Sequence, residues 1–252
     1  FDTCYVDVWA RGDSLHFHDI DLRRDSVRAR LAGASDRHEI FAGTLAVTIE
    51  DLRDLPARWE WPPLAGRARG SVAVDGPLDS LGVTGAVAYS DLSLGPMLAD
   101  SGEASVRGAR VLGEDWQLTA AARGDGFHLG GVPLGTYALD LRGDATSAVV
   151  DSFHAARGDT QVVVRGRADF LPDRADLDIA HADLWLAGNR WRLVDPLAAA
   201  LGPGLLDVPR FHLVSDQGEL LAEAHYAAAD SVVTGQLDVR NFDLNLLDPF
   251  LR

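Results

Sequence analysis

The fold class is decided by one stretch near the end of the chain, Trp191–Leu251, which reads WRLVDPLAAALGPGLLDVPRFHLVSDQGELLAEAHYAAADSVVTGQLDVRNFDLNLLDPFL. Three runs in it carry apolar residues at alternate positions: Val208–Val214, Leu220–Tyr226 and Val233–Val239. Clusters of Gly, Asp and Ser separate these runs. A period of two, bounded by turn residues, is typical of antiparallel strands with one apolar and one polar face. The stretch therefore predicts a β-meander.

The same pattern extends through the rest of the chain. It is clearest in Glu39–Ile49, and turns such as Arg123–Gly126 separate successive runs. The strongest helical candidate is Glu50–Trp61, although Pro56 limits it to a turn or two. The sequence thus predicts an all-β fold, a long and mostly antiparallel meander with one or two short helical turns.

No shift in composition marks a linker between domains. We expect residues 1–252 to form one β-rich segment, with a candidate seam at residues 50–64. The sequence begins at Phe1 without an initiator Met, so we expect it to be a segment of a longer protein.

Charge and cysteine content exclude several classes of function. The net charge is −15 and all 23 basic residues are Arg, spread singly along the chain. Binding to nucleic acid or to an anionic membrane surface needs clustered cations, so neither is expected. Cys4 is the only cysteine, which excludes an internal disulfide and metal sites built on Cys pairs. No apolar run approaches the ~20 residues of a membrane-spanning helix.

A short element with the pattern D-L-x-L occurs three times, at Asp91–Leu94, Asp183–Leu186 and Asp243–Leu246. Each follows a strand whose apolar residues have odd numbers, whereas its own leucines have even numbers. A slip of one residue would turn those leucines to the opposite face of the sheet. Each junction therefore predicts a β-bulge or a bend that keeps the leucines on the apolar face.

A nucleophile motif lies near the beginning of the chain. Gly12–Leu15 spells GDSL, the motif of an esterase and lipase family in which Ser14 would be the nucleophile. Partners of the form Asp-x-x-His occur at Asp125–His128 and Asp151–His154, but both lie in mid-chain. Those enzymes have an α/β fold, and this sequence lacks the helices between strands, so we interpret the motif as a turn.

Two further motifs are weak. The tripeptide Arg11-Gly12-Asp13 matches an integrin-binding motif, but a bare tripeptide has little specificity. His16 and His18 could ligate a metal from one strand face, yet no third ligand is indicated. We predict no catalytic residue, no metal site and no cofactor.

Several sequence segments resemble those of the TamB (translocation and assembly module) family, within the AsmA-like and bridge-like lipid-transfer group. The first is Gly70–Leu81, GSVAVDGPLDSL, followed by Asp91–Leu94. The second combines Trp191–Leu193, Phe211–Leu220 and Val239–Leu244. The resemblance covers roughly Trp59 to Leu251 and consists of turns and alternation. Helix-prone Asp195–Ala200 departs from the family's uninterrupted strand pattern.

The resemblance implies a location and a function. Members are periplasmic bridges tethered to the inner membrane, with a β-sheet curled into a U-shaped "β-taco" around an apolar groove. They act in outer-membrane biogenesis, protein secretion and phospholipid transport between membranes. For this chain the resemblance implies phospholipid acyl chains or unfolded membrane-protein strands as partners. It also implies an outer-membrane β-barrel of the assembly type as partner of the full-length protein, and it implies no enzymatic activity.

Alternation identifies the residues that would face such a groove, although it does not distinguish an open groove from a packed core. An alternative is a closed β-sandwich of an extracellular structural or adhesive protein, and a third hypothesis is a hydrolase that uses Ser14. The lipid-groove candidates are Leu45, Val47, Ile49, Val72, Val74, Leu177, Ile179, Phe211, Leu213, Leu237, Val239, Leu244 and Leu246.

Overall fold

The chain is built almost entirely of β-strands. The structure, a computed structural model, describes residues 2–54, 64–77, 79–186, 188–228 and 232–241. Its seventeen strands belong to one sheet, and every strand pair whose register is described is antiparallel. This confirms the predicted all-β antiparallel meander. The described strands form one sheet, whereas a β-sandwich would consist of two stacked sheets.

The chain divides into two compact units, residues 1–125 and 126–252. The candidate seam at residues 50–64, most of which lies outside the described residues, stays a prediction. Unit 1 contains β1 (Thr3–Arg11), β2 (Ser14–Arg24), β3 (Val27–Ser35), β4 (Ile40–Ile49), the 3₁₀-helix η1 (Leu52–Asp54), β5 (Leu64–Pro77), β6 (Gly82–Leu94), β7 (Met97–Ala109) and most of β8 (Gln117–Leu129).

Unit 2 continues the meander from the end of β8. It contains β9 (Val132–Asp144), β10 (Ser147–Arg157), β11 (Thr160–Phe170), β12 (Ala175–Leu186), β13 (Asn189–Leu193), β14 (Leu197–Gly202), β15 (Leu205–Val214), β16 (Glu219–Ala227) and β17 (Val232–Arg240). Both β13 and β14 pair with β12 and with β15, so the two short strands share one place in the sheet. The helix-prone residues Asp195–Ala200 thus overlap a strand.

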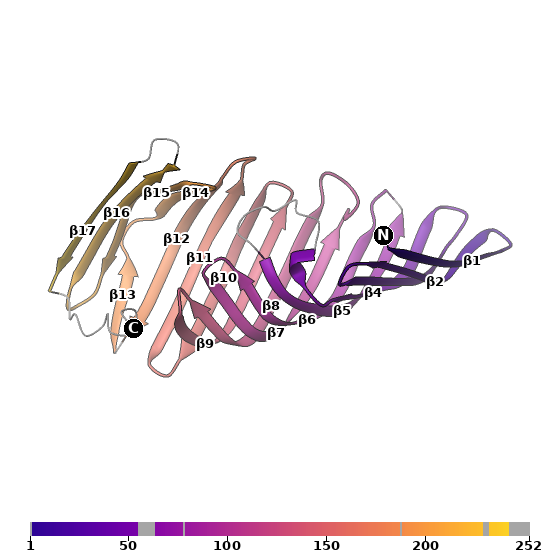
Figure 1. Cartoon of the computed structure of the whole chain (residues 1–252), viewed down its shortest axis with the longest axis horizontal. Helices are drawn as coiled ribbons and strands as arrows, with labels where there is room; N and C mark the ends of the chain where they lie inside the picture. The colour runs from indigo at the N-terminus through magenta and orange to yellow at the C-terminus, as the bar shows by residue number, and fades with distance from the viewer. Residues whose placement is uncertain (1, 55–63, 78, 187, 229–231, 242–252) are drawn as a thin grey trace. The chain divides into compact units, whose positions relative to one another are not determined.

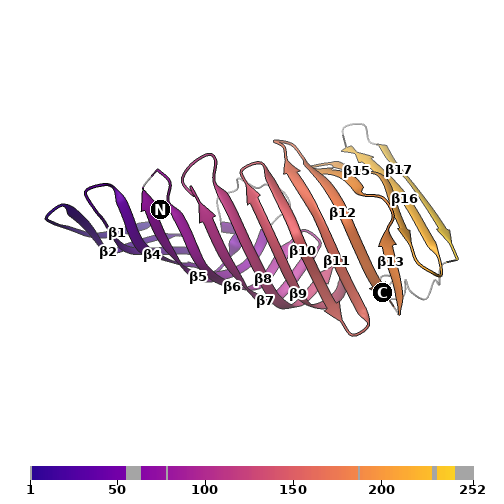
Figure 2. The same cartoon turned by 180° about the vertical axis from the view of Figure 1, so that it is seen from behind.

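Long strands bend part-way along their length. In unit 1 the ribbons of β5, β6 and β7 curve (Figures 1 and 2). β-bulges occur inside strands of both units, and a bulge adds a residue on one strand and locally increases bend and twist. Bulges therefore give a local cause for the curvature.

Two of the three junctions at which the D-L-x-L elements predict a bulge or a bend contain a β-bulge. In β6, Asp91 and Leu92 lie opposite the single residue Gly66 of β5, and both Asp91 (φ 54°) and Gly66 (φ 122°) have positive φ. In β12 the extra residue lies at Ile179–Ala180, opposite Gly166 and just before Asp183–Leu186. These two bulges confirm the prediction, while the third junction, at Asp243–Leu246, lies outside the described residues.

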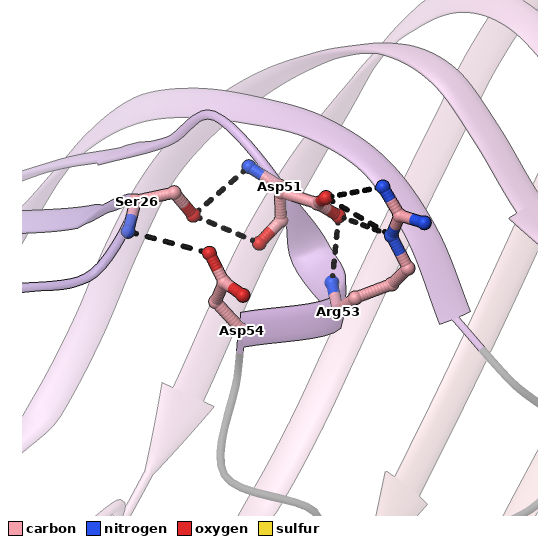
Figure 3. Close-up of polar contacts among 4 residues, drawn as sticks. All are labelled: Ser26, Asp51, Arg53 and Asp54. Carbon is pink, nitrogen blue, oxygen red and sulfur yellow. Dashed lines mark hydrogen bonds and ion pairs between the residues drawn. The ribbon is translucent and has the colours of Figure 1, made fainter.

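The end of β4 is fixed by a polar link to the turn between β2 and β3 (Figure 3). The Ser26 hydroxyl donates to the Asp51 carbonyl and accepts from the Asp51 amide, each at 3.1 Å, and the Ser26 amide donates to the Asp54 carboxylate. The adjacent Leu52 is buried. Of the helical candidate Glu50–Trp61, only Leu52–Asp54 forms a helical turn, and residues 55–63 lie outside the described part.

Candidate functional site: an apolar sheet face

One face of the sheet in unit 1 is lined by apolar side chains. Residues directly opposite each other in an antiparallel pair lie on the same face, so the registers identify its members. Starting from Leu45 on β4, the partners are Leu31 on β3 and Val72 on β5, and the row continues across the neighbouring strands. Three adjacent rows consist only of Val, Leu, Ile, Phe, Ala, Gly and one Cys: Val8–Phe17–Gly33–Gly43–Val74–Val83–Gly108, Val6–Ile20–Leu31–Leu45–Val72–Gly85–Val106 and Cys4–Leu22–Ala29–Val47–Gly70–Val87–Ala104. We call this set the apolar face of unit 1.

Unit 2 has an apolar face of the same kind. Four rows cross β15, β16 and β17, and they hold Leu206–Tyr226–Val233, Val208–Ala224–Gly235, Phe211–Ala222–Leu237 and Leu213–Leu220–Val239. Three rows cross β10, β11 and β12, and they hold Ala155–Val162–Leu184, Phe153–Val164–Ala182 and Ala148–Ala168–Leu177. We call these rows the apolar face of unit 2. Tyr226 carries their one polar side-chain group.

The structure brings the predicted groove residues together within each unit. Leu45, Val47, Ile49, Val72 and Val74 share the apolar face of unit 1, since Ile49 continues the alternation of β4. Leu177, Phe211, Leu213, Leu237 and Val239 belong to that of unit 2, and Ile179 pairs with Leu197 beside Leu177. Leu244 and Leu246 lie outside the described residues. The shared face is a structural fact; the lipid contact of these residues stays a prediction.

How well the protein itself covers these faces varies along each of them: Ala155 in unit 2 is fully buried, while Val6 in unit 1 is 55% exposed. In unit 1, Phe41, Val74 and Leu81 are buried and form a core cluster with partly buried neighbours that include Leu45 and Val72. In unit 2, Leu237 is 65% exposed and Val233 is 75% exposed. Leu45, Val72 and Val74 thus pack within the protein, whereas the apolar residues of β17 remain open to contact.

Glycines on the apolar face make room for larger neighbours, a feature that the sequence interpretation missed. A Cβ on Gly70 would lie 2.7 Å from Val87 Cγ2, and one on Gly85 would lie 2.7 Å from Val72 Cγ1. The phenyl ring of Phe41 approaches both Gly33 and Gly43 as closely. The signal was present in the sequence, because these glycines occupy the alternate positions that are otherwise apolar.

The opposite face is polar and contains a compact charge cluster. Asp21 on β2 is nearly buried, and its carboxylate accepts hydrogen bonds from Arg28 (3.0 and 2.6 Å), Arg23 (3.2 Å) and Arg30 (3.3 Å). The hydrogen bonds from Arg28 and then Arg23 hold the pKa of the Asp21 carboxyl far below its usual range. The pKa of Arg28 is raised in turn, chiefly by its hydrogen bond to Asp21.

The other chemical motifs do not assemble into a site among the described residues. His16 stacks on Trp9, with ring centroids 4.2 Å apart, while His18 Nδ1 lies 3.2 Å from an Asp7 carboxylate oxygen. No group of three or more His, Cys, Asp or Glu residues in the described part is placed to hold a metal ion. Within that part, no hydrogen bond joins Ser14 to a histidine.

Comparison with known proteins found no match: no family model, curated protein or solved structure matched the chain. The resemblance to the TamB family therefore stays a prediction from sequence. Among the described helices, none is long and apolar enough to cross a membrane.

Proposed function

We propose that this chain is a groove-forming periplasmic segment of a TamB/AsmA-like protein that acts in outer-membrane biogenesis. It would shield hydrocarbon during phospholipid transport between membranes, and the full-length protein would assist the translocation or assembly of outer-membrane or secreted proteins with a β-barrel partner. The observation that carries this proposal is the apolar face, which extends over strand after strand in each unit.

The chemistry of the face favours acyl chains over an unfolded polypeptide. An alkyl chain gains roughly 0.8 kcal/mol for each buried CH₂ group and needs no directional partner. A peptide buried there would lose the hydration of its backbone N–H and C=O groups, at about 1–3 kcal/mol for each group without a new partner. The three rows of unit 1 offer no hydroxyl, amide or charged side chain to replace that water. We therefore place phospholipid acyl chains first among the expected ligands.

Photo-crosslinking tests this assignment. A photoreactive amino acid is introduced at Leu237 or Phe211 on the apolar face of unit 2, and the protein is irradiated with phospholipid vesicles. Matched variants carry the same group at Gln236 or His212, which are the sequence neighbours on the polar face. Mass spectrometry of intact protein reads the adducts.

Phospholipid adducts at Leu237 and Phe211, at least tenfold above those at Gln236 and His212, are expected if the apolar face holds acyl chains. Equal labelling of both faces would mean that lipid merely coats the surface, and would overturn the proposal. The absence of lipid adducts at all four positions would overturn it as well.

A further inference from the structure

The loop between β7 and β8, residues 110–116, folds back over the apolar face of unit 1. The Val111 amide donates a hydrogen bond of 3.0 Å to the carbonyl oxygen of Leu81, which lies directly before β6. A Cβ placed on Gly108 would lie 2.8 Å from Val111 Cγ1, so the valine side chain occupies the space above this glycine. Gly108 is the β7 member of the first apolar row described above. We call the contact between Leu81 and Val111 the latch.

The latch covers a well-packed part of the apolar face. Leu81 is buried together with Phe41 and Val74, and Val111 packs against this cluster. Val74 is 7% exposed, whereas Val72, two residues earlier on the same strand and face, is only partly buried. An acyl chain that occupied this part of the face would have to take the place of the latch.

Few interactions fasten the loop to the rest of unit 1. Among the described residues, the bond from Val111 to Leu81 is the one backbone hydrogen bond outside the strand pairs that joins the loop to another element. The bond from the Gly113 amide to the Arg110 carbonyl and the ion pair of Arg110 with Asp115 both lie within the loop. Arg110 has a φ of 54°, a conformation that costs free energy for a residue other than glycine. Such a loop can open locally while the strands stay paired.

We infer that the latch is a lid over the apolar face of unit 1, which acyl chains displace when they bind. The inference rests on the function proposed above, since the acyl chain is the ligand assigned there. Opening removes apolar contacts of Leu81 and Val111. The methylene groups of an acyl chain replace such contacts, because these contacts have no directional requirement. The closed lid keeps Val74 and its neighbours out of water while no lipid is bound.

Thiol labelling tests the lid without lipid. Cys4→Ser removes the native thiol, and Val74→Cys places a thiol of similar size beneath the latch. Val111→Ser, which sets a hydroxyl against the apolar cluster, should raise the rate of labelling by a water-soluble maleimide at least fivefold. Leu112→Ser is the matched control, because the Leu112 side chain on the same loop is 71% exposed and its loss should leave the rate unchanged.

A second thiol position separates lid opening from unfolding. Ala99 is buried in unit 1 and is not among the described members of the cluster beneath the latch. In Cys4→Ser/Ala99→Cys, the further change Val111→Ser should leave the labelling rate unchanged. Equal labelling at position 74 with and without Val111→Ser, or a similar increase at both thiol positions, would overturn the inference.

A disulfide tests whether lipid needs the open lid. The hydrogen bond between Leu81 and Val111 keeps their Cα atoms within roughly the 4.4–6.8 Å that a disulfide spans. Leu81→Cys/Val111→Cys in the Cys4→Ser background therefore locks the lid on oxidation and releases it on reduction. A photoreactive phenylalanine is placed at Phe17, which packs against the cluster, or at Phe211 in unit 2. With phospholipid vesicles, oxidation should reduce the lipid adducts at Phe17 at least fivefold and leave those at Phe211 unchanged.

The outcomes separate the lid from the proposed function. Adducts at Phe17 that are equal before and after oxidation, or adducts at Phe211 alone in the reduced protein, would overturn the lid and leave the proposed function standing. No adducts at either position would overturn the proposed function and, with it, the ligand assigned to the lid. Failure of the two introduced cysteines to link, read by intact mass, would show that the latch contact is absent and would overturn the inference as well.

Discussion

A single carboxylate organises the charges on the polar face of unit 1. Asp21 is surrounded by three guanidinium groups, from Arg23, Arg28 and Arg30, although the chain as a whole is strongly acidic. The three arginines extend from two adjacent strands, so their shared partner ties β2 to β3 through side chains as well as through the backbone. Isolated surface ion pairs contribute little, whereas a shared, nearly buried acceptor is the geometry in which they matter.

Replacement of Asp21 should therefore destabilise the protein in a pH-dependent way. The folded-state pKa of Asp21 lies below that of the unfolded chain, about 3.9. Its stabilisation is thus complete above that value and is lost as the pH falls toward the folded-state pKa. Asp21→Asn should lower Tm at pH 7, and the difference in Tm from the unmodified protein should shrink as the pH falls below about 4.

Thermal unfolding followed by circular dichroism measures this difference. Asp100→Asn is the control, because Asp100 is exposed and forms no ion pair among the described residues. A difference in Tm that stayed constant from pH 7 down to the acid limit would contradict the assigned role of the Asp21 carboxylate.

At the scale of elements, the bulge in β6 determines which leucines join the apolar face. Gly66 faces Asp91 and Leu92 with a positive φ, and a Cβ there would lie 2.7 Å from the Asp91 carbonyl oxygen. The extra residue keeps Leu92 and Leu94 in phase with Tyr89. The bulge is therefore a specified feature of the sheet, since its backbone conformation depends on one glycine.

Substitution of the glycine at this bulge should lower the stability of the protein more than substitution of an ordinary turn glycine. Gly66→Ala combines left-handed strain with a backbone clash, whereas Gly130→Ala has the strain alone, because no atom lies within 4 Å of its added Cβ. We expect the free energy of unfolding to fall by at least ~1 kcal/mol more for Gly66→Ala than for Gly130→Ala in urea denaturation. Equal losses would show that the bulge rearranges without cost.

Much of this architecture could be predicted from the alternation of apolar and polar residues alone. A strand with one buried and one solvated face repeats every two residues. Glu39–Ile49 predicts β4 to within a residue at its first end. The helix-prone residues Asp195–Ala200 overlap β14 because Leu197 and Ala199 pair with Ile179 and Leu177, and long-range pairing overrides a local helical preference. The predicted turn Arg123–Gly126 lies inside β8.

The candidate site was predicted in part. The alternation of apolar and polar residues identified members of the apolar face in each unit, such as Leu45 in unit 1 and Leu177 in unit 2. It could not show that Phe41 and Leu81 cover part of that face in unit 1, because such packing depends on turns and side chains distant in sequence. It also could not show the exposure of Leu237, which depends on β17 having a single neighbour among the described strands.

At the scale of the whole molecule, net charge opposes the approach of an anionic lipid surface. The chain carries a charge of −15, so such a surface is repelled at long range. The Debye length falls from about 30 Å at 0.01 M salt to about 8 Å at 0.15 M, whereas an apolar contact is short-ranged. Added salt within this range should therefore increase the lipid adducts formed at Leu237 with vesicles that contain anionic phospholipid. A decrease with salt would show instead that ion pairs hold the lipid.

The order of pairing in the meander has a consequence for how the chain reaches its structure. Among the described strands, most pairs form between immediate neighbours in sequence, and the exceptions, around β13 and β14, skip a single strand. The entropy of loop closure is small when contacting segments are close in the chain, and such topologies fold quickly. Each hairpin can dock on the one made before it, so a chain that emerges gradually from a ribosome or a secretion channel could acquire its sheet strand by strand, without waiting for its far end.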